Sequence, residues 1–154
     1  MILLSIDPGT INMGWAVFKS SILLAHGVHN YKGPYSGKKL SAIANSLCEL
    51  FKTYTPDELV VENYFTQSNA KGAGVVSELR GLIRYMWAFY SDGKEMHEVH
   101  PGTVKKQCTG DGGCSKEQLK SWVEGYYNIT IKVQDEGDSV AQGHTWLKLQ
   151  ATKE

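Results

Sequence analysis

Three short apolar runs joined by tight turns fill the first thirty residues, and this spacing leaves few folds open. Ile2 to Asp7 is rich in residues that favour strands, and the turn sequence Pro8-Gly9-Thr10 stops it. Gly14 to Lys19 and Ile22 to Tyr31 have the same character and equally short connections. Strands joined by such turns run antiparallel. We therefore expect a three-stranded antiparallel meander at the start of the chain.

A helix and a fourth strand are predicted next. Lys39 to Tyr54 has apolar residues at the spacing of one helix face, namely Leu40, Ile43, Leu47, Leu50, Phe51 and Tyr54. Pro56 ends this helix, and Glu58 to Glu62 is the next strand. A strand reached through a helix is typically parallel to the strand before it. The order is thus three strands, a helix and a strand parallel to the first.

The rest of the chain predicts further helices and one short strand. A helix over Asn69 to Tyr90 carries two apolar stripes, of which one can pack on the sheet and the other on a neighbouring helix or a second subunit. The first stripe is Val75, Leu79, Leu82, Met86 and Phe89, and the second is Val76, Ile83, Trp87 and Tyr90. Glu95 to Val99 is a short strand. The resulting fold class is α/β, with a mixed five-stranded sheet (the meander plus two parallel strands) flanked by helices.

Two more helices complete the predicted elements. Ser115 to Gln118 fits a capping box, and the helix it begins has Leu119, Trp122, Val123 and Tyr126 on one face. The last helix begins near Asp135. The glycine-rich run from Thr109 to Gly113 is expected to be a loop.

Composition is that of one folded domain spanning residues 1–154. Hydrophobic residues make up 42% of the chain and charged residues 21%, which excludes a disordered chain. The opening apolar run is too short to cross a membrane, and no basic stretch precedes it as in a signal peptide, so we expect a cytoplasmic protein. The net charge of +0 is unusual for a DNA-binding protein, although four lysines cluster locally. These are Lys105, Lys106, Lys116 and Lys120.

The cysteines do not indicate a disulfide framework or a zinc ribbon. The chain has 3 of them, Cys48, Cys108 and Cys114, and no CxxC pair. A zinc site built from Cys108, Cys114, His97 and His100 is a minor alternative, because the usual short gap within a ligand pair is missing between the cysteines.

Four carboxylates at the ends of predicted elements are the candidate catalytic residues. Asp7 ends the first strand and Glu62 the fourth, so parallel neighbours about 4.8 Å apart would bring both to one sheet edge. Asp135 and Asp138 are three residues apart, which places them on similar sides of a helix. Four converging acids could hold two divalent cations about 4 Å apart for phosphodiester hydrolysis. Ligands that are all oxygen favour Mg²⁺, with Mn²⁺ as a substitute, over zinc.

Each acid, taken alone, is explained better by a local role than by catalysis. Asp7 precedes Pro-Gly and could be a turn residue, and Glu62 could be a polar strand end. Asp135 and Asp138 could cap a helix or favour its dipole. Only the joint pattern favours catalysis.

Five segments in order resemble the motifs of the RuvC-type Holliday junction resolvases, which have a ribonuclease H-like fold. The opening segment is Ser5-Ile-Asp-Pro-Gly-Thr-Ile-Asn-Met-Gly-Trp-Ala-Val17, and the second acidic motif is Val60-Val-Glu-Asn-Tyr-Phe65. His100-Pro-Gly-Thr-Val-Lys105, Ser115-Lys-Glu-Gln118 and Asp135-Glu-Gly-Asp-Ser-Val140 complete the set. An Asp-Pro-Gly-Thr strand end is also found in actin-like ATPases and sugar kinases, but the chain has no length for a second ATPase lobe.

The resemblance implies roles for particular residues. The four acids would be the catalytic metal ligands, and Lys105 and Lys116 would contact DNA, with Lys106 beside them. Phe65 would stack on a base at the branch point. The helix 69–90, with Arg80 and Gly81, would form a homodimer interface. Glu136 stands where the family usually has a small residue, and it could be an additional or substitute ligand for Asp135.

The implied activity is that of a Mg²⁺-dependent, homodimeric endonuclease that resolves Holliday junctions and other branched DNA by paired nicks, with two ions in each site. The neutral charge suggests a phage-encoded member working in the cytoplasm of a bacterial host. A junction-binding architectural protein that has lost turnover is the alternative from another class. The sequence does not separate a four-way junction resolvase from a nuclease that also cuts forks and three-way junctions.

Overall fold

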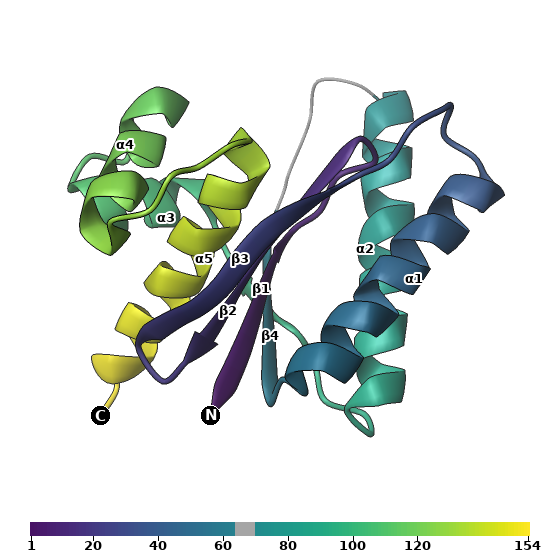
Figure 1. Ribbon diagram of the computed structural model, residues 1–154, viewed down its shortest axis with the longest axis horizontal. Helices are drawn as coiled ribbons and strands as arrows, with labels where there is room; N and C mark the ends of the chain where they lie inside the picture. The colour runs from purple at the N-terminus through teal and green to yellow at the C-terminus, as the bar shows by residue number, and fades with distance from the viewer. Residues whose placement is uncertain (64–69) are drawn as a thin grey trace.

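A five-stranded sheet in the order β3-β2-β1-β4-β5 forms the middle layer of the protein (Figure 1). The computed structural model describes residues 1–63 and 70–154. β1 (Ile2–Asp7) pairs antiparallel with β2 (Asn12–Lys19), and β2 pairs antiparallel with β3 (Ile22–Asn30). β4 (Glu58–Glu62) is parallel to β1, and β5 (His97–Val99) is parallel to β4. The predicted meander and the two parallel strands are confirmed.

Helices cover both faces of the sheet, in two groups (Figure 1). One face carries α1 (Gly37–Tyr54) and α2 (Ala70–Tyr90). The other carries α3 (Pro101–Thr109), α4 (Lys116–Tyr127) and α5 (Gln134–Ala151). None of these helices, in the residues that the structure describes, is long and apolar enough to span a membrane.

The strands alternate their side chains between two apolar cores. Leu4 and Val61 belong to the core under α1 and α2, whereas Leu3 and Val60 belong to the core under α3, α4 and α5. All four side chains are completely buried. Both faces of β1 and β4 are therefore apolar, as is typical of central parallel strands covered by helices on both sides.

α3 was not predicted, and this is a correction to the sequence analysis. Pro101 stands at the first position of this helix, where its missing N–H costs nothing. The helix is capped by His100, whose Nδ1 accepts a hydrogen bond from the Gly102 N–H at 3.1 Å. α4, in contrast, has the predicted capping box with both of its hydrogen bonds.

The two predicted stripes of α2 are buried to different extents. Its buried face consists of Leu79, Ile83 and Trp87, which takes members from both stripes. Phe89, assigned to the first stripe, is 82% exposed. On α4, Tyr126 is likewise exposed, contrary to its predicted place on the inner face.

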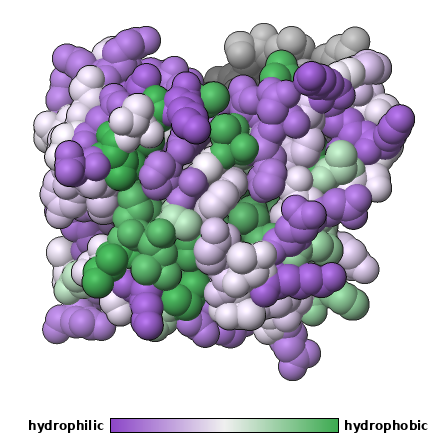
Figure 2. All heavy atoms as spheres, viewed as in Figure 1, coloured by the Kyte–Doolittle hydropathy of each residue, from purple (hydrophilic) through white to green (hydrophobic). Residues whose placement is uncertain are grey.

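Two of the described elements carry more than one large, exposed apolar side chain. One is the edge strand β3, where Ile22 and Leu24 are exposed, and Figure 2 shows apolar surface where β3 crosses the front of the molecule. The other is α2, where Tyr85 and Phe89 are exposed and their rings stack on each other. The outer surface of α2 is therefore available for a partner.

Candidate active site

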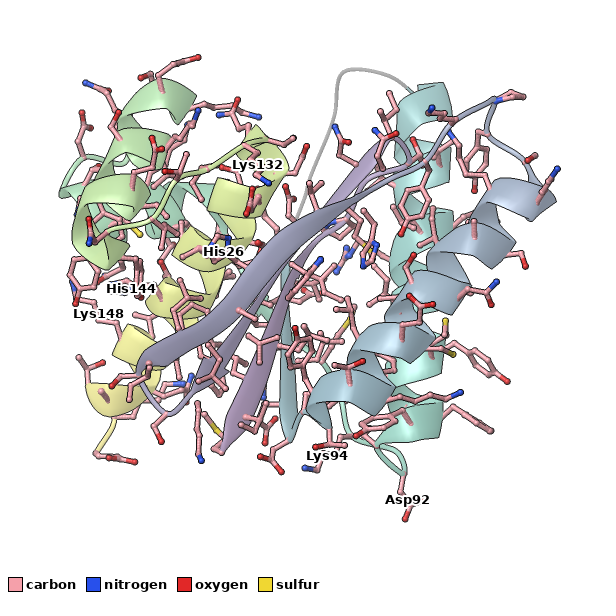
Figure 3. The ribbon with its side chains drawn as sticks, in the orientation of Figure 1. His26, Asp92, Lys94, Lys132, His144 and Lys148 are labelled. Carbon is pink, nitrogen blue, oxygen red and sulfur yellow. The ribbon has the colours of Figure 1, made fainter. Side chains whose placement is uncertain are left out.

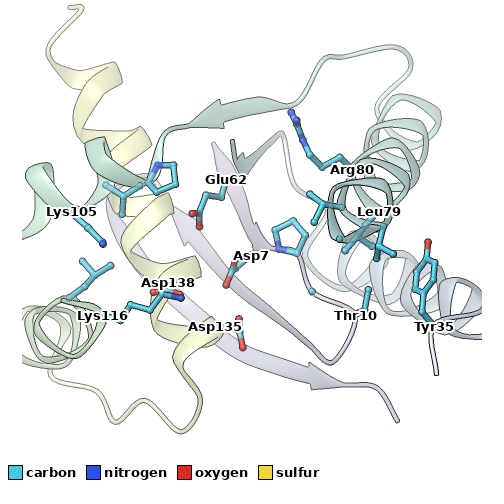
Figure 4. A pocket seen from close by; sticks show the side chains of 18 residues that line it. Asp7, Thr10, Tyr35, Glu62, Leu79, Arg80, Lys105, Lys116, Asp135 and Asp138 are labelled. Carbon is cyan, nitrogen blue, oxygen red and sulfur yellow. The ribbon is translucent and has the colours of Figure 1, made fainter. Parts of the chain in front are cut away.

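The ends of two parallel strands and the start of α5 meet at one edge of the sheet (Figure 4). The register pairs Ile6 of β1 with Val61 of β4, so the acids that follow them, Asp7 and Glu62, lie at the same edge. Asp135 and Asp138 lie in the first two turns of α5 and face Asp7. We call these four residues, Asp7, Glu62, Asp135 and Asp138, the acid cluster.

A close backbone approach brings the start of α5 onto the sheet. A Cβ atom at Gly14 of β2 would lie 1.9 Å from the carbonyl oxygen of Asp135. Only glycine permits this approach, because real Cβ atoms are essentially never closer than 3.0 Å to another heavy atom. Gly14 thereby sets the distance between the strand layer and the acid-bearing turn.

Buried polar side chains fix α5 farther along its length. The Ser5 hydroxyl donates a hydrogen bond to the Ser139 carbonyl oxygen at 2.7 Å. The Gln142 amide donates to the carbonyl oxygens of Ile6 at 2.9 Å and Val60 at 3.0 Å. Gln142 is completely buried, and burying such a group is favourable only when it is hydrogen-bonded. These residues were missed in the sequence, where their only signal was a polar residue within an apolar run.

Three members of the acid cluster are close enough to share a metal ion. One carboxylate oxygen each from Asp7, Asp135 and Asp138 lies within 4.8 Å of the other two. Glu62 completes the cluster from the end of β4 (Figure 4). The structure thus brings all four predicted acids together.

Burial and mutual repulsion raise the pKa values of three of these acids. Burial, with the charges of Glu62, Asp138 and Asp135, raises the pKa of Asp7 well above its usual value, and a hydrogen bond with Asp135 adds to the effect. The pKa of Glu62 rises to about 7, mainly through burial and the charge of Asp138. Burial also raises the pKa of Asp138 to about 6. Such a site has a deficit of positive charge, which a divalent cation would relieve.

Lysines from two helices face the acid cluster across a cleft of about 570 Å³. Lys105 of α3 and Lys116 of α4 line the cleft, and their charges lower the pKa values of Glu62 and Asp138. Lys106 is exposed and does not line the cleft. Phe65 lies outside the described residues. The side of the cleft opposite these lysines is formed by α2, with Val76 and Leu79 among its lining residues.

Glu136 does not join the acid cluster, although it follows Asp135 directly. Its side chain is buried and contacts His26 of β3 and the backbone N–H of Lys132. Both carboxylate oxygens therefore already have protein partners. Asp135, and not Glu136, faces Asp7.

The alternative zinc site does not form. His97 pairs with Glu58 at 2.7 Å, and the Cys108 thiol contacts the Ala141 carbonyl oxygen and the Thr145 hydroxyl. His100 caps α3. Within residues 1–63 and 70–154, the one group of His, Cys, Asp or Glu side chains with metal-ligand spacing is Asp7, Asp135 and Asp138.

Comparison with known proteins shows similarity over nearly the whole chain. Residues 3–145 match the family model described as "Crossover junction endodeoxyribonuclease RuvC". The protein of that name from Brachyspira hyodysenteriae is 32% identical over 146 residues, which cover 92% of this chain and 90% of that protein. Its counterpart from Rickettsia typhi is 30% identical over 154 residues, which cover 96% of this chain and 97% of that protein.

The fold is also that of solved RuvC structures. Thermus thermophilus RuvC superposes with a TM-score of 0.81 at 20% identity, covering 99% of this chain and 97% of that one. The same protein in complex with Holliday junction substrate gives a TM-score of 0.83 at 20% identity, covering 99% and 96%.

Proposed function

Since the chain belongs to the RuvC family of crossover junction endodeoxyribonucleases, we propose that the acid cluster is the catalytic metal site with which it cuts branched DNA. The observation that carries this proposal is the convergence of Asp7 with the Asp135–Asp138 pair in a cleft flanked by two lysines. A role in ending a strand or capping a helix does not require an acid to lie beside three others. The local roles of the four acids therefore do not explain why they converge.

The donor set fits a divalent cation bound through oxygen. The ligands are carboxylates, and no His or Cys side chain shares the group, so Mg²⁺ is the proposed ion and Mn²⁺ its substitute. A bound divalent ion supplies Lewis-acid chemistry, which makes water more acidic and offsets charge on the phosphodiester. Burial and the neighbouring carboxylates raise the pKa of Asp7, so this side chain would give up a proton on binding the ion.

The two lysines position the DNA. Lys105 of α3 and Lys116 of α4 extend toward the acid cluster (Figure 4). Each ammonium group can pair with a backbone phosphate and release a counterion. These contacts hold the strand without reading its sequence, and they bring the scissile phosphate over the acids. Lys106, exposed on α3, would contact a phosphate outside the cleft.

A homodimer would make two paired nicks possible. We place its interface on the outer face of α2, where Tyr85 is 68% and Phe89 is 82% exposed. A two-fold dimer presents two acid clusters related by symmetry, which matches the symmetry of a four-way junction. Phe89→Glu should shift the protein from dimer to monomer in sedimentation equilibrium. A monomeric wild-type protein would contradict this assignment.

The proposed activity is tested by comparing four DNA substrates of matched sequence: a four-way junction, a three-way junction, a fork and a linear duplex. Each is incubated with and without Mg²⁺. We expect paired nicks in the four-way junction only when the ion is present, and no cutting of linear duplex. Binding without metal-dependent nicking would instead indicate an architectural protein, and equal cutting of all branched substrates would indicate a broader nuclease.

A further inference from the structure

The helix that carries half of the acid cluster lacks a side-chain cap. The N-cap of α5 is Val133, whose side chain offers no hydrogen bond to the first turn. The first turns of a helix are prone to fraying unless their N–H groups find partners. Asp135 and Asp138 nevertheless have to be held there against the repulsion of the other acids. Another contact must fix this turn.

Glu136 makes that contact from within the turn itself. One of its carboxylate oxygens accepts the N–H of Lys132 at 3.1 Å, in the segment that leads into α5. The other lies 2.5 Å from Nδ1 of His26 on strand β3. Glu136 is only 4% exposed. Figure 3 shows His26 and Lys132 on the side of the sheet where α5 lies.

We propose that Glu136 and His26 form a clamp that positions Asp135 and Asp138 for metal binding. Glu136 ties the start of α5 to its own lead-in segment and to β3, while the absence of a Cβ at Gly14 lets the same turn lie against β2. The turn is therefore held from two strands of the meander, β2 and β3. Glu136 and His26 are positioning residues, because neither belongs to the acid cluster or lines the cleft.

A charge effect has to be separated from a positioning effect. Glu136 is an anion beside a cation site, so its loss could weaken metal binding through electrostatics alone. His26 offers the distinction, since its removal takes no negative charge from the site. Glu136→Gln offers a second one: the amide oxygen can still accept the Lys132 N–H and the amide nitrogen can donate to the imidazole, but the charge is gone.

The chain also contains a matched control. Glu124 of α4 accepts the N–H of Ile131 at 3.1 Å, the amide next to the one that Glu136 accepts. It secures the same connecting segment, but from the α4 side and away from the acid cluster. Glu124→Ala therefore reports what a loosened connection does when the clamp is intact.

The test measures Mn²⁺ binding to the metal-free full-length protein by electron paramagnetic resonance, with thermal unfolding recorded for every variant. We expect His26→Ala and Glu136→Ala to raise the Kd for Mn²⁺ about 10-fold or more, as loss of contacts around metal ligands typically does. Glu136→Gln and Glu124→Ala should stay within about 3-fold of wild type. Metal-free binding of a four-way junction should be unchanged in all four.

Three outcomes would overturn the clamp. If Glu136→Ala and Glu136→Gln lost Mn²⁺ affinity equally and His26→Ala lost none, only the charge of Glu136 would matter. A loss in Glu124→Ala as large as that in Glu136→Ala would show a general effect of the connecting segment. Unchanged Mn²⁺ affinity in His26→Ala would refute the role of β3 even if Glu136→Ala failed to fold.

Discussion

Adding a single methyl group at Gly14 should disable the active site without unfolding the protein. The new Cβ of Gly14→Ala would lie 1.9 Å from the Asp135 carbonyl oxygen and 2.9 Å from the Glu136 backbone nitrogen. These are backbone atoms, so no side-chain rotation relieves the clash. A contact of at least 3.0 Å requires the turn to move by about 1 Å, which separates Asp135 from Asp7.

The expected cost to catalysis is larger than the cost to stability. A displacement of about 1 Å in a catalytic group can reduce the rate roughly 100-fold. Overpacking of this kind costs about 1 to 3 kcal/mol of unfolding free energy, and domains of ordinary stability survive that. The rate is measured by single-turnover cleavage of a four-way junction with saturating protein and Mg²⁺, and the stability by urea unfolding.

Gly27→Ala is the matched control for this experiment. Its Cβ would lie 2.7 Å from the ring of Trp15, which is on a neighbouring strand and packs against the core under α1 and α2. We expect a similar loss of stability and a cleavage rate within about 3-fold of wild type. Cleavage at the wild-type rate by Gly14→Ala would refute the claim that the close contact between the Gly14 and Asp135 backbones sets the position of Asp135. If Gly27→Ala lowered the cleavage rate as much as Gly14→Ala, overpacking anywhere in the meander would be sufficient to explain the loss of cleavage.

Other substitutions test the remaining parts of the site. Glu62 has a pKa raised from 4.5 to about 7, so its contribution to stability is present below pH 4.5 and lost as the pH rises through about 7. Glu62→Gln should therefore stabilise the metal-free protein at pH 8 by on the order of 2 kcal/mol and change little at pH 4, as thermal unfolding at the two pH values would show. Gln142→Met should destabilise the protein by about 1 to 3 kcal/mol in urea unfolding, because it leaves the Ile6 and Val60 carbonyl oxygens without their donor. Lys116→Ala should weaken junction binding and reduce the slope of log affinity against log salt concentration by about 1. It should also move the acidic limb of the pH profile of cleavage to higher pH, since the lysine lowers the pKa of Asp138. Unchanged values in any of these assays would remove the corresponding residue from the account.

The sheet and most helices could be predicted because their signals are local. The meander follows from short turns, and α4 from a capping box whose two hydrogen bonds are both present. α3 was missed because a proline and a glycine at its start suggest a turn, and its cap is a histidine. The sequence did not decide which stripe of α2 is buried, because both stripes are apolar and only the tertiary contacts determine which side chains are covered.

The sequence predicted which acids lie together in the site, but it did not predict the contacts that keep them in position. The strand order placed Asp7 beside Glu62, and helical spacing paired Asp135 with Asp138. The choice between Asp135 and Glu136 remained open, since both lie in the same helical turn. In the structure the Glu136 carboxylate contacts His26, which is more than a hundred residues away, and Asp135 lies in the acid cluster.

The central claim is that Asp7 binds a catalytic metal ion together with Asp135 and Asp138. It is tested most directly by single-turnover cleavage of a four-way junction by Asp7→Asn, with junction binding measured on the same preparation. The amide keeps the size of the side chain but is a poor ligand for Mg²⁺. We predict that cleavage falls at least about 1000-fold, a loss of roughly 4 kcal/mol in transition-state stabilisation, while binding stays close to wild type. Cleavage at the wild-type rate would contradict the account.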